Sequence, residues 1–300
     1  MPRARRIVVG GIGTQVIEAG PADATEAVVF VHGNPGSSAD FTDLVDQVGE
    51  FARAVAFDMP GFGKADKPDD FEYHVGAYAN FIQSALEELG ITRVHLVVHD
   101  FGGPFGMVWG LMHPDAWAST VLFNIGIMPG YHWHKRARQW RTPVLGELTM
   151  AWIPRGAWRR AFLSAPGRKL PIEFVDEMYD NFDRKTRKVV LKLYRATPDP
   201  GERADEIGAA IKALNKPALV VWGMCDQFVP GEYAERQREF FDVQDVVKLD
   251  DSGHWPFRDN PEAASAAVLP YLRAQLSSQK PPGAARPWRG SRRPRAGSRR

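Results

Sequence analysis

Short apolar runs alternate with helical patterns through the first half of the chain, and this alternation limits the fold more than any other feature. Four runs rich in Val, Ala and Phe are predicted to be buried strands: 27–33, 53–61, 94–100 and 119–126. Residues 39–52 and 74–90, between these runs, repeat apolar side chains at helical spacing. Uninterrupted apolar strands separated by helices are typical of a parallel sheet covered on both faces, so we expect an α/β protein.

The segment that follows the fourth strand has a different pattern. Residues 128–197 are rich in Trp and Arg, with helical spacing and few strand signals. The elements expected after it are strands at 217–223 and 245–253 and a helix at 260–276. We therefore predict one core, 1–127 and 205–276, interrupted by a helical insertion at 128–204. Two short strands joined by a Gly-rich turn are expected at the N-terminus.

Composition points to a globular protein of a reducing compartment. The 300 residues are 44% hydrophobic and 25% charged, and Cys225 is the single cysteine, which rules out an internal disulfide. No apolar run approaches the roughly 18 residues of a membrane span, and the N-terminus lacks the apolar region of a signal peptide. The expected location is the cytoplasm.

Positive charge gathers in two parts of the chain. Residues 277–300 hold one Lys and seven Arg with no acid, and such a Pro-, Gly- and Arg-rich tail is predicted to be disordered. It is either an electrostatic tether or simply a solvated extension. Residues 128–200 carry 15 Lys and Arg against 7 Asp and Glu. The basic insertion and the basic tail together suggest weak contact with anionic lipid.

The segment 97–104, "VVHDFGGP", has the outline of a nucleophile elbow, with a strand, a Gly-rich turn and a helix. An elbow holds its central residue above the sheet, and here that residue is Asp100 rather than serine. Asp100 could alternatively serve only as a helix N-cap, a position that Asp favours.

Two later residues favour the catalytic interpretation of Asp100. Asp226 follows one predicted strand, and His254 lies in the loop after the next. The chain order of nucleophile, acid and base is that of α/β-hydrolases. We expect His254 to be the general base and Asp226 to orient it, although Asp250 and Asp251 compete for the second role.

The segment "VHGNPGSS" at 31–38 ends the first buried strand. In an elbow enzyme this loop supplies one backbone N–H of the oxyanion hole, here from Asn34, and Phe101 supplies the other. His32 and Pro35 could alternatively only shape a tight turn, and that role is expected of His32 in either case.

Five motifs together, "HGNP", "DMPGFGKADKP", "HDFGG", "WGMCDQFVP" and "GHWPFRDNPE", resemble the epoxide hydrolase and haloalkane dehalogenase branch of the α/β-hydrolase superfamily. The resemblance covers residues 25–275 and implies an α/β-hydrolase fold with a helical cap inserted after the sixth strand. It implies no metal and no organic cofactor. A carboxylate nucleophile agrees with this branch, because it attacks saturated carbon and forms an ester that water can hydrolyse, whereas serine would form a stable ether.

The two activities of this branch differ in the leaving group. An epoxide oxygen needs a proton, whereas a halide needs only N–H donors. Dehalogenases typically carry Trp where this chain has Phe101, which has no donor. The family's cap tyrosine corresponds to Tyr194, 32 residues before Asp226. Asn34 is the dehalogenase-like choice at its position.

The family also implies a second cap tyrosine, and no residue stands at the expected place. Tyr131, His132 and His134 are the candidates for that second donor. We expect an epoxide hydrolase that forms a vicinal diol, with a haloalkane dehalogenase or a hydrolase-like binding protein with a vestigial site as alternatives. The expected partners are a lipophilic epoxide, an anionic membrane and a second copy of the chain, with no specific nucleic acid.

Overall fold

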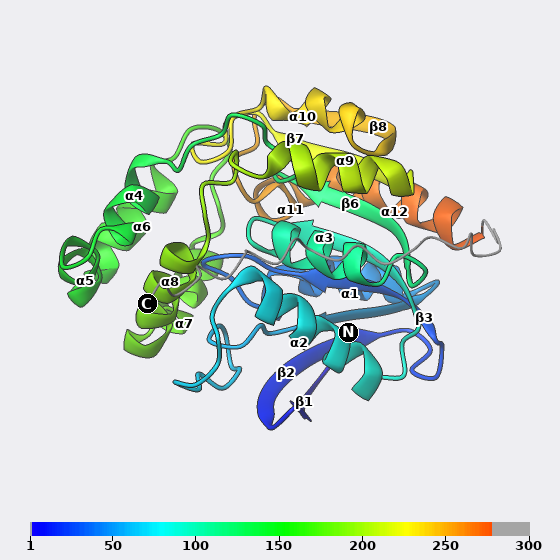
Figure 1. Cartoon of the computed structure of the whole chain (residues 1–300), viewed down its shortest axis with the longest axis horizontal. Helices are drawn as coiled ribbons and strands as arrows, with labels where there is room; N and C mark the ends of the chain where they lie inside the picture. Colours follow the sequence, from blue (N-terminus) through cyan, green and yellow to red (C-terminus); the bar gives the residue numbers. More distant parts are fainter. Residues whose placement is uncertain (1, 278–300) are drawn as a thin grey trace, which may run out of the picture.

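The computed structural model describes residues 2–277 and is built around one eight-stranded sheet (Figure 1). The strand order is β1-β2-β4-β3-β5-β6-β7-β8, with β1, β2 and β4 paired antiparallel and all other neighbours parallel. The strands are β1 Arg3–Val9, β2 Ile12–Ala19, β3 Glu26–Val31, β4 Arg53–Phe57, β5 Arg93–His99, β6 Trp117–Phe123, β7 Pro217–Gly223 and β8 Asp242–Leu249. The α/β class and the N-terminal pair of strands are confirmed. The predicted disordered tail lies outside the described residues.

Helices cover both faces of the sheet. One layer holds α2, α3 and α9, and the opposite layer holds α1 and α12, which pack on each other (Figure 1). The core helices are α1 Thr42–Gly49, α2 Val75–Glu88, α3 Gly102–Met112, α9 Ala204–Leu214, α10 Tyr233–Arg236, α11 Pro256–Asp259 and α12 Pro261–Ser277, with short 3-10 turns at Ser38–Phe41 and Gln237–Glu239. Because the central strands are covered on both sides, all five residues of β4 are buried.

Five helices form the segment between β6 and α9, which we call the cap segment (residues 128–204). They are α4 Lys135–Arg141, α5 Leu145–Ala151, α6 Arg155–Leu163, α7 Ile172–Asn181 and α8 Arg184–Ala196. In Figure 1 they lie together at one side of the molecule, beyond the point where the chain leaves β6. Within the segment, α4 packs on α5, both pack on α8, and α6 packs on α7.

Some strand ends predicted from the apolar pattern differ from those in the structure, for a physical reason. The run at 53–61 stays buried after β4 ends at Phe57, because the following loop lies under the cap segment. A Cβ on Gly61 would come within 2.6 Å of Val189 on α8. Conversely, β8 starts at Asp242, three residues before the predicted start, since this edge strand is half exposed and its polar residues hide the strand pattern.

Between residues 2 and 277, no helix is both long enough and apolar enough to cross a membrane.

Candidate active site

Asp100 stands in a tight turn between β5 and α3. Its backbone φ is 50°, in the left-handed region that non-glycine residues rarely adopt. The turn closes because two neighbours are glycines: a Cβ on Gly33 would lie 2.4 Å from the Asp100 side chain, and a Cβ on Gly102 would lie 2.0 Å from the Val31 carbonyl oxygen. Such strain persists only where the surrounding structure imposes it, and it is typical of functional sites.

The two carboxylate oxygens of Asp100 have different neighbours. The backbone N–H of Asn34 donates to Oδ1 at 2.7 Å, and Nε2 of His254 lies 3.5 Å from Oδ2. An ester formed through Oδ2 would therefore leave Oδ1 as the carbonyl oxygen, already held by a backbone donor. This is the arrangement that stabilises an oxyanion on Oδ1.

His254 is held from its other side by Asp226. Nδ1 of His254 donates to Oδ2 of Asp226 at 2.6 Å, and Asn124 donates to the same oxygen at 2.8 Å. The other Asp226 oxygen accepts the backbone N–H groups of Phe228 and Val229. Asp251, an alternative in the sequence, instead pairs with Arg168 at the surface.

Asn124 is a positioning residue that the sequence reasoning missed. It directly follows β6, has a φ of 47°, and also exchanges hydrogen bonds with the backbone of Gly223 at the end of β7. The available signal was a polar residue placed immediately after a buried strand, the same signal that pointed to Asp226.

The charges of this group set its protonation. Burial lowers the pKa of His254, but the two carboxylates of Asp226 and Asp100 outweigh burial and raise that pKa to about 10. Burial raises the pKa of Asp100, while the hydrogen bond and charge of His254 bring it below its ordinary value. In the resting site, His254 is thus an imidazolium between two carboxylates.

A second histidine, His99, lies directly behind His254. The rings are 4.5 Å apart, and Nε2 of His99 is 2.7 Å from the His254 carbonyl oxygen. Burial, followed by the charge of His254, lowers the pKa of His99 to about 3, so the ring is neutral. A neutral His99 donates this hydrogen bond and fixes the loop that carries the base. The sequence reasoning missed this residue.

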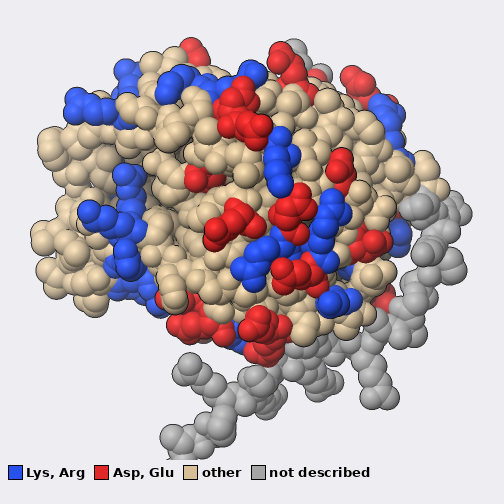
Figure 2. Space-filling model, turned by 90° about the horizontal axis from the view of Figure 1, so that it is seen from above, with Lys and Arg blue, Asp and Glu red and all other residues tan. Residues whose placement is uncertain are grey.

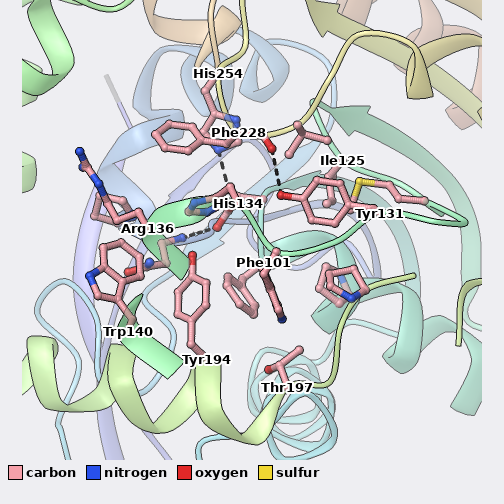
Figure 3. A pocket seen from close by; sticks show the side chains of 18 of the residues that line it. Phe101, Ile125, Tyr131, His134, Arg136, Trp140, Tyr194, Thr197, Phe228 and His254 are labelled. Carbon is pink, nitrogen blue, oxygen red and sulfur yellow. Dashed lines mark hydrogen bonds and ion pairs between the residues drawn. The ribbon is translucent and has the colours of Figure 1, made fainter. Parts of the chain in front are cut away.

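A cavity of about 670 Å³ opens above Asp100, between the core and the cap segment. Its walls are largely apolar and aromatic, and the polar side chains of His134, Tyr194 and His254 also face it (Figure 3). Phe101 and Phe228 come from the core, and Tyr194, Trp133 and Trp140 from the cap segment. Its size and lining are typical of a small-molecule site.

Tyr194 on α8 extends into this cavity from the cap segment. Its ring makes an edge contact with Phe101 at 4.9 Å and lies 5.0 Å from Trp133. Burial and then the charge of Asp100 raise its pKa well above the ordinary value, so the hydroxyl keeps its proton. Tyr194 therefore presents a neutral O–H donor near the carboxylate.

His134 provides a second donor at the start of α4. Its Nδ1 accepts the backbone N–H of Ala137, and burial lowers its pKa to about 4. A neutral imidazole that accepts at Nδ1 carries its proton at Nε2. In Figure 3 the side chains of His134, Tyr194 and His254 converge on one part of the cavity. Of the three candidates for the second cap donor, His134 is thus one whose side chain lines the cavity and whose Nε2 carries a proton.

The remaining predicted residues occupy other places. His132 is 81% exposed and lies 3.6 Å from Asp199 at the edge of the cavity, and its own side chain is not part of the cavity lining. Tyr131 lines the cavity, but its hydroxyl already donates to the Phe228 carbonyl. Both ring nitrogens of His32 bond to backbone, at Gly33 and Met59, so His32 shapes the loop rather than facing substrate.

Residues 2–277 contain no cluster of three or more His, Cys, Asp or Glu side chains arranged to hold a metal ion.

Comparison with known proteins places the fold in a family. A family model described as "alpha/beta hydrolase fold" matches residues 26–261. A cis-3-alkyl-4-alkyloxetan-2-one decarboxylase from Xanthomonas campestris is 27% identical, over 87% of this chain and 93% of its own. A haloalkane dehalogenase from Bradyrhizobium diazoefficiens is 28% identical, over 89% and 93%.

Solved structures agree in fold. An epoxide hydrolase from Vigna radiata has a TM-score of 0.74 at 18% identity, over 91% of this chain and 98% of its own. The resemblance to the epoxide hydrolase and haloalkane dehalogenase branch is confirmed, and dehalogenase names are the more frequent among the similar proteins.

Proposed function

The chain belongs to the α/β-hydrolase fold family, and we propose that within it the protein is an epoxide hydrolase that forms vicinal diols. The observation that carries this proposal is the pair of neutral, protonated donors, Tyr194 and His134, in the cavity of Asp100. An opening epoxide needs such a donor, and a departing halide does not. Phe101 offers no side-chain N–H to a halide.

In the first half-reaction, Oδ2 of Asp100 attacks one epoxide carbon and the bond from that carbon to the ring oxygen breaks. The ring oxygen takes a proton from Tyr194, with the Nε2–H of His134 as a second donor. The product is an ester between Asp100 and a hydroxyalkyl group. Esterification removes one of the two carboxylate charges that raise the pKa of His254.

The loss of that charge turns His254 into the base. His254 gives its proton to the deprotonated Tyr194, which becomes neutral again. The free imidazole, oriented by Asp226, then takes a proton from water. The hydroxide attacks Cγ of Asp100, and the oxyanion forms on Oδ1, where the Asn34 N–H already donates. Collapse breaks the ester C–O bond, and the departing alkoxide takes the proton of His254 to give the diol. The carboxylic acid left on Asp100 then protonates His254, which restores the resting imidazolium and carboxylate.

A haloalkane dehalogenase is the second candidate. The same three core residues would form the ester, and Asn34, which lines the cavity beside Asp100, would contact the halide together with the Tyr194 hydroxyl. The dehalogenase relative supports this candidate, whereas Phe101 and the two neutral donors favour an epoxide.

A substrate panel distinguishes the candidates. Purified protein is incubated separately with styrene oxide, 1-bromobutane and a cis-3,4-dialkyl-oxetan-2-one, and diol, bromide and carbon dioxide are measured. Diol as the dominant product supports the proposal, and dominant bromide or carbon dioxide contradicts it. No product from any of the three substrates would favour a vestigial binding protein.

The ester intermediate is tested with His254→Gln and with labelled water. His254→Gln should still be alkylated by the epoxide, so intact-mass spectrometry should show protein plus substrate, with the adduct on Asp100. In ¹⁸O water with enzyme in excess, wild-type protein should place the label in Asp100 and not in the first diol released. A labelled diol in that first turnover would show direct attack by water and contradict the ester mechanism.

A further inference from the structure

The outer side of α5 presents an apolar cluster to solvent. Val144 is 69% exposed, Leu148 68% and Trp152 79%, and Leu145 is 41% exposed. We call these four residues the cap face. Among the described residues, they are four of only six large apolar side chains that are strongly exposed. Single exposed apolar residues are common, but a contiguous group of them marks an interaction site.

The cap face is one side of a helix, which sets its shape. Leu145 and Leu148 are spaced by three residues and so lie on the same side of α5, and Trp152 follows directly at the C-terminal end of the helix. Gly146 and Met150, on the other side, are buried where α5 packs on α4 and α8. The helix thus has two apolar sides, and the fold uses only one of them.

Exposed cations stand on the two helices that pack against α5. Lys135 and Arg138 project from α4, and Lys185 and Lys188 from α8, all exposed. Within residues 2–277, none of the four has an ion pair, whereas the acid of α5, Glu147, is paired with Arg195. At the left of Figure 2, the side of the molecule where the cap helices lie in Figure 1, basic residues are exposed without acids beside them, whereas both signs are mixed elsewhere on that face.

We propose that the cap face docks on an anionic lipid bilayer, with Trp152 and Leu148 inserted at the headgroup level and the cations of α4 and α8 on the lipid phosphates. Exposed indole and aliphatic side chains next to helices that carry unpaired cations are the chemistry of an interfacial helix. A second copy of the chain fits less well, because two cap faces in contact would bring the cations of both copies together. The basic residues 280–300 would strengthen the same attraction.

Docking would place the cavity next to the lipid. Thr149 and Ile153, which flank the exposed Trp152 along the chain, both line the cavity wall. A lipophilic substrate dissolved in the bilayer could thus enter the cavity from the cap side. This delivery rests on the proposed function, whereas docking itself does not.

The test is co-sedimentation of the full chain with vesicles. Wild-type protein should bind vesicles of phosphatidylglycerol and phosphatidylcholine and should not bind vesicles of phosphatidylcholine alone. The double variant Leu148→Ser, Trp152→Ser should reduce the bound-to-free ratio at least about tenfold, because ten-fold corresponds to ~1.4 kcal/mol and burying one indole exceeds that. Val8→Ser, at another exposed apolar position on β1 (61% exposed), is the control and should bind as wild type.

The charge requirement has its own pair of variants. Arg138→Glu with Lys188→Glu should abolish binding to the anionic vesicles, while Lys212→Glu on α9 should not. Unchanged melting temperatures keep the variants comparable whether or not the protein hydrolyses epoxides. A third variant changes Arg292, Arg293 and Arg295 to Gln in the full-length protein. The proposal would be overturned if vesicle binding survived both double variants and were lost only in this third variant. A dimer that dissociates in the Leu148, Trp152 variant, without vesicle binding by wild type, would assign the face to a second copy.

Discussion

The floor of the cavity and its roof are built in different ways. On the floor, each reacting side chain follows a β-strand or joins two strand ends, and Asp226 and His254 are 0% and 4% exposed. In the roof, Tyr194 and His134 sit on helices of the cap segment, and their positions depend on ring contacts and on one helix cap. The roof also carries the exposed apolar cap face.

This difference separates two kinds of chemistry. The floor provides a nucleophile, a base and an oxyanion donor, which any ester made on Asp100 requires. The roof provides the protons, which only a basic leaving group requires. Changes to the floor should therefore affect every substrate, and changes to the roof should affect some substrates and spare others.

The largest effect is expected for Asp100→Asn on the floor. An amide cannot form the ester, so kcat/KM should fall on the order of 10⁴-fold or more for every substrate that turns over. The measurement is steady-state product formation, with mass spectrometry to verify that no adduct forms. Asp251→Asn removes a carboxylate from the surface ion pair with Arg168 and should keep most of the activity.

Removal of the roof donors should give a smaller and selective loss. Tyr194→Phe and His134→Gln should each lower kcat/KM about 10²-fold for an epoxide, the usual contribution of a positioned acid. The rate of adduct formation with a bromoalkane, measured in the His254→Gln background, should change little. Tyr131→Phe is the control, because the Tyr131 hydroxyl donates its hydrogen bond to the Phe228 carbonyl oxygen. Equal losses on both substrates would mean that the two side chains shape the cavity or bind the leaving group without donating a proton to it.

The variant His99→Phe should lower kcat about tenfold, because it removes one buried hydrogen bond to the His254 loop, which contributes ~1–3 kcal/mol. His99→Gln can still donate to that carbonyl and should recover most of the rate. The readout is kcat with its pH profile, because a displaced imidazole should also titrate differently. If Phe and Gln behave alike, His99 is a packing residue only.

The smallest effect concerns the charge that couples Asp100 and His254 on the floor. Asp100→Asn should lower the pKa of His254 from about 10 by at least about one unit, since one of the two carboxylates that raise it is neutralised. NMR titration of the imidazole measures this shift directly. A pKa unchanged by Asp100→Asn would contradict the idea that esterification frees the base.

The raised pKa of His254 also affects the stability of the folded protein. The pKa of His254 is higher in the folded protein than its unfolded value of about 6.5, so protonation of His254 stabilises the fold. This contribution to the free energy of unfolding is complete below pH ~6.5 and is lost as the pH rises towards 10.

The sequence predicted the floor better than the roof, for a physical reason. A buried parallel strand is a continuous apolar run, and the polar residue that ends it is visible in one dimension, as with Asp100 and Asp226. Asn124 gives the same signal but was overlooked. Tyr194 was found only through the family resemblance, and three candidates stood for the second donor. His134 is distinguished from Tyr131 and His132 by burial and hydrogen bonding, which depend on how α4 lies over the core.

The strained backbone at Asp100 has a consequence for engineering. Any L-residue at this position pays for a φ of 50°, at a cost of about 1 kcal/mol or more, and glycine does not. Selection of variants for heat resistance alone, with no requirement for turnover, should thus enrich glycine over alanine at position 100. A variant that gains heat resistance in this way would lack the nucleophile and would therefore be inactive.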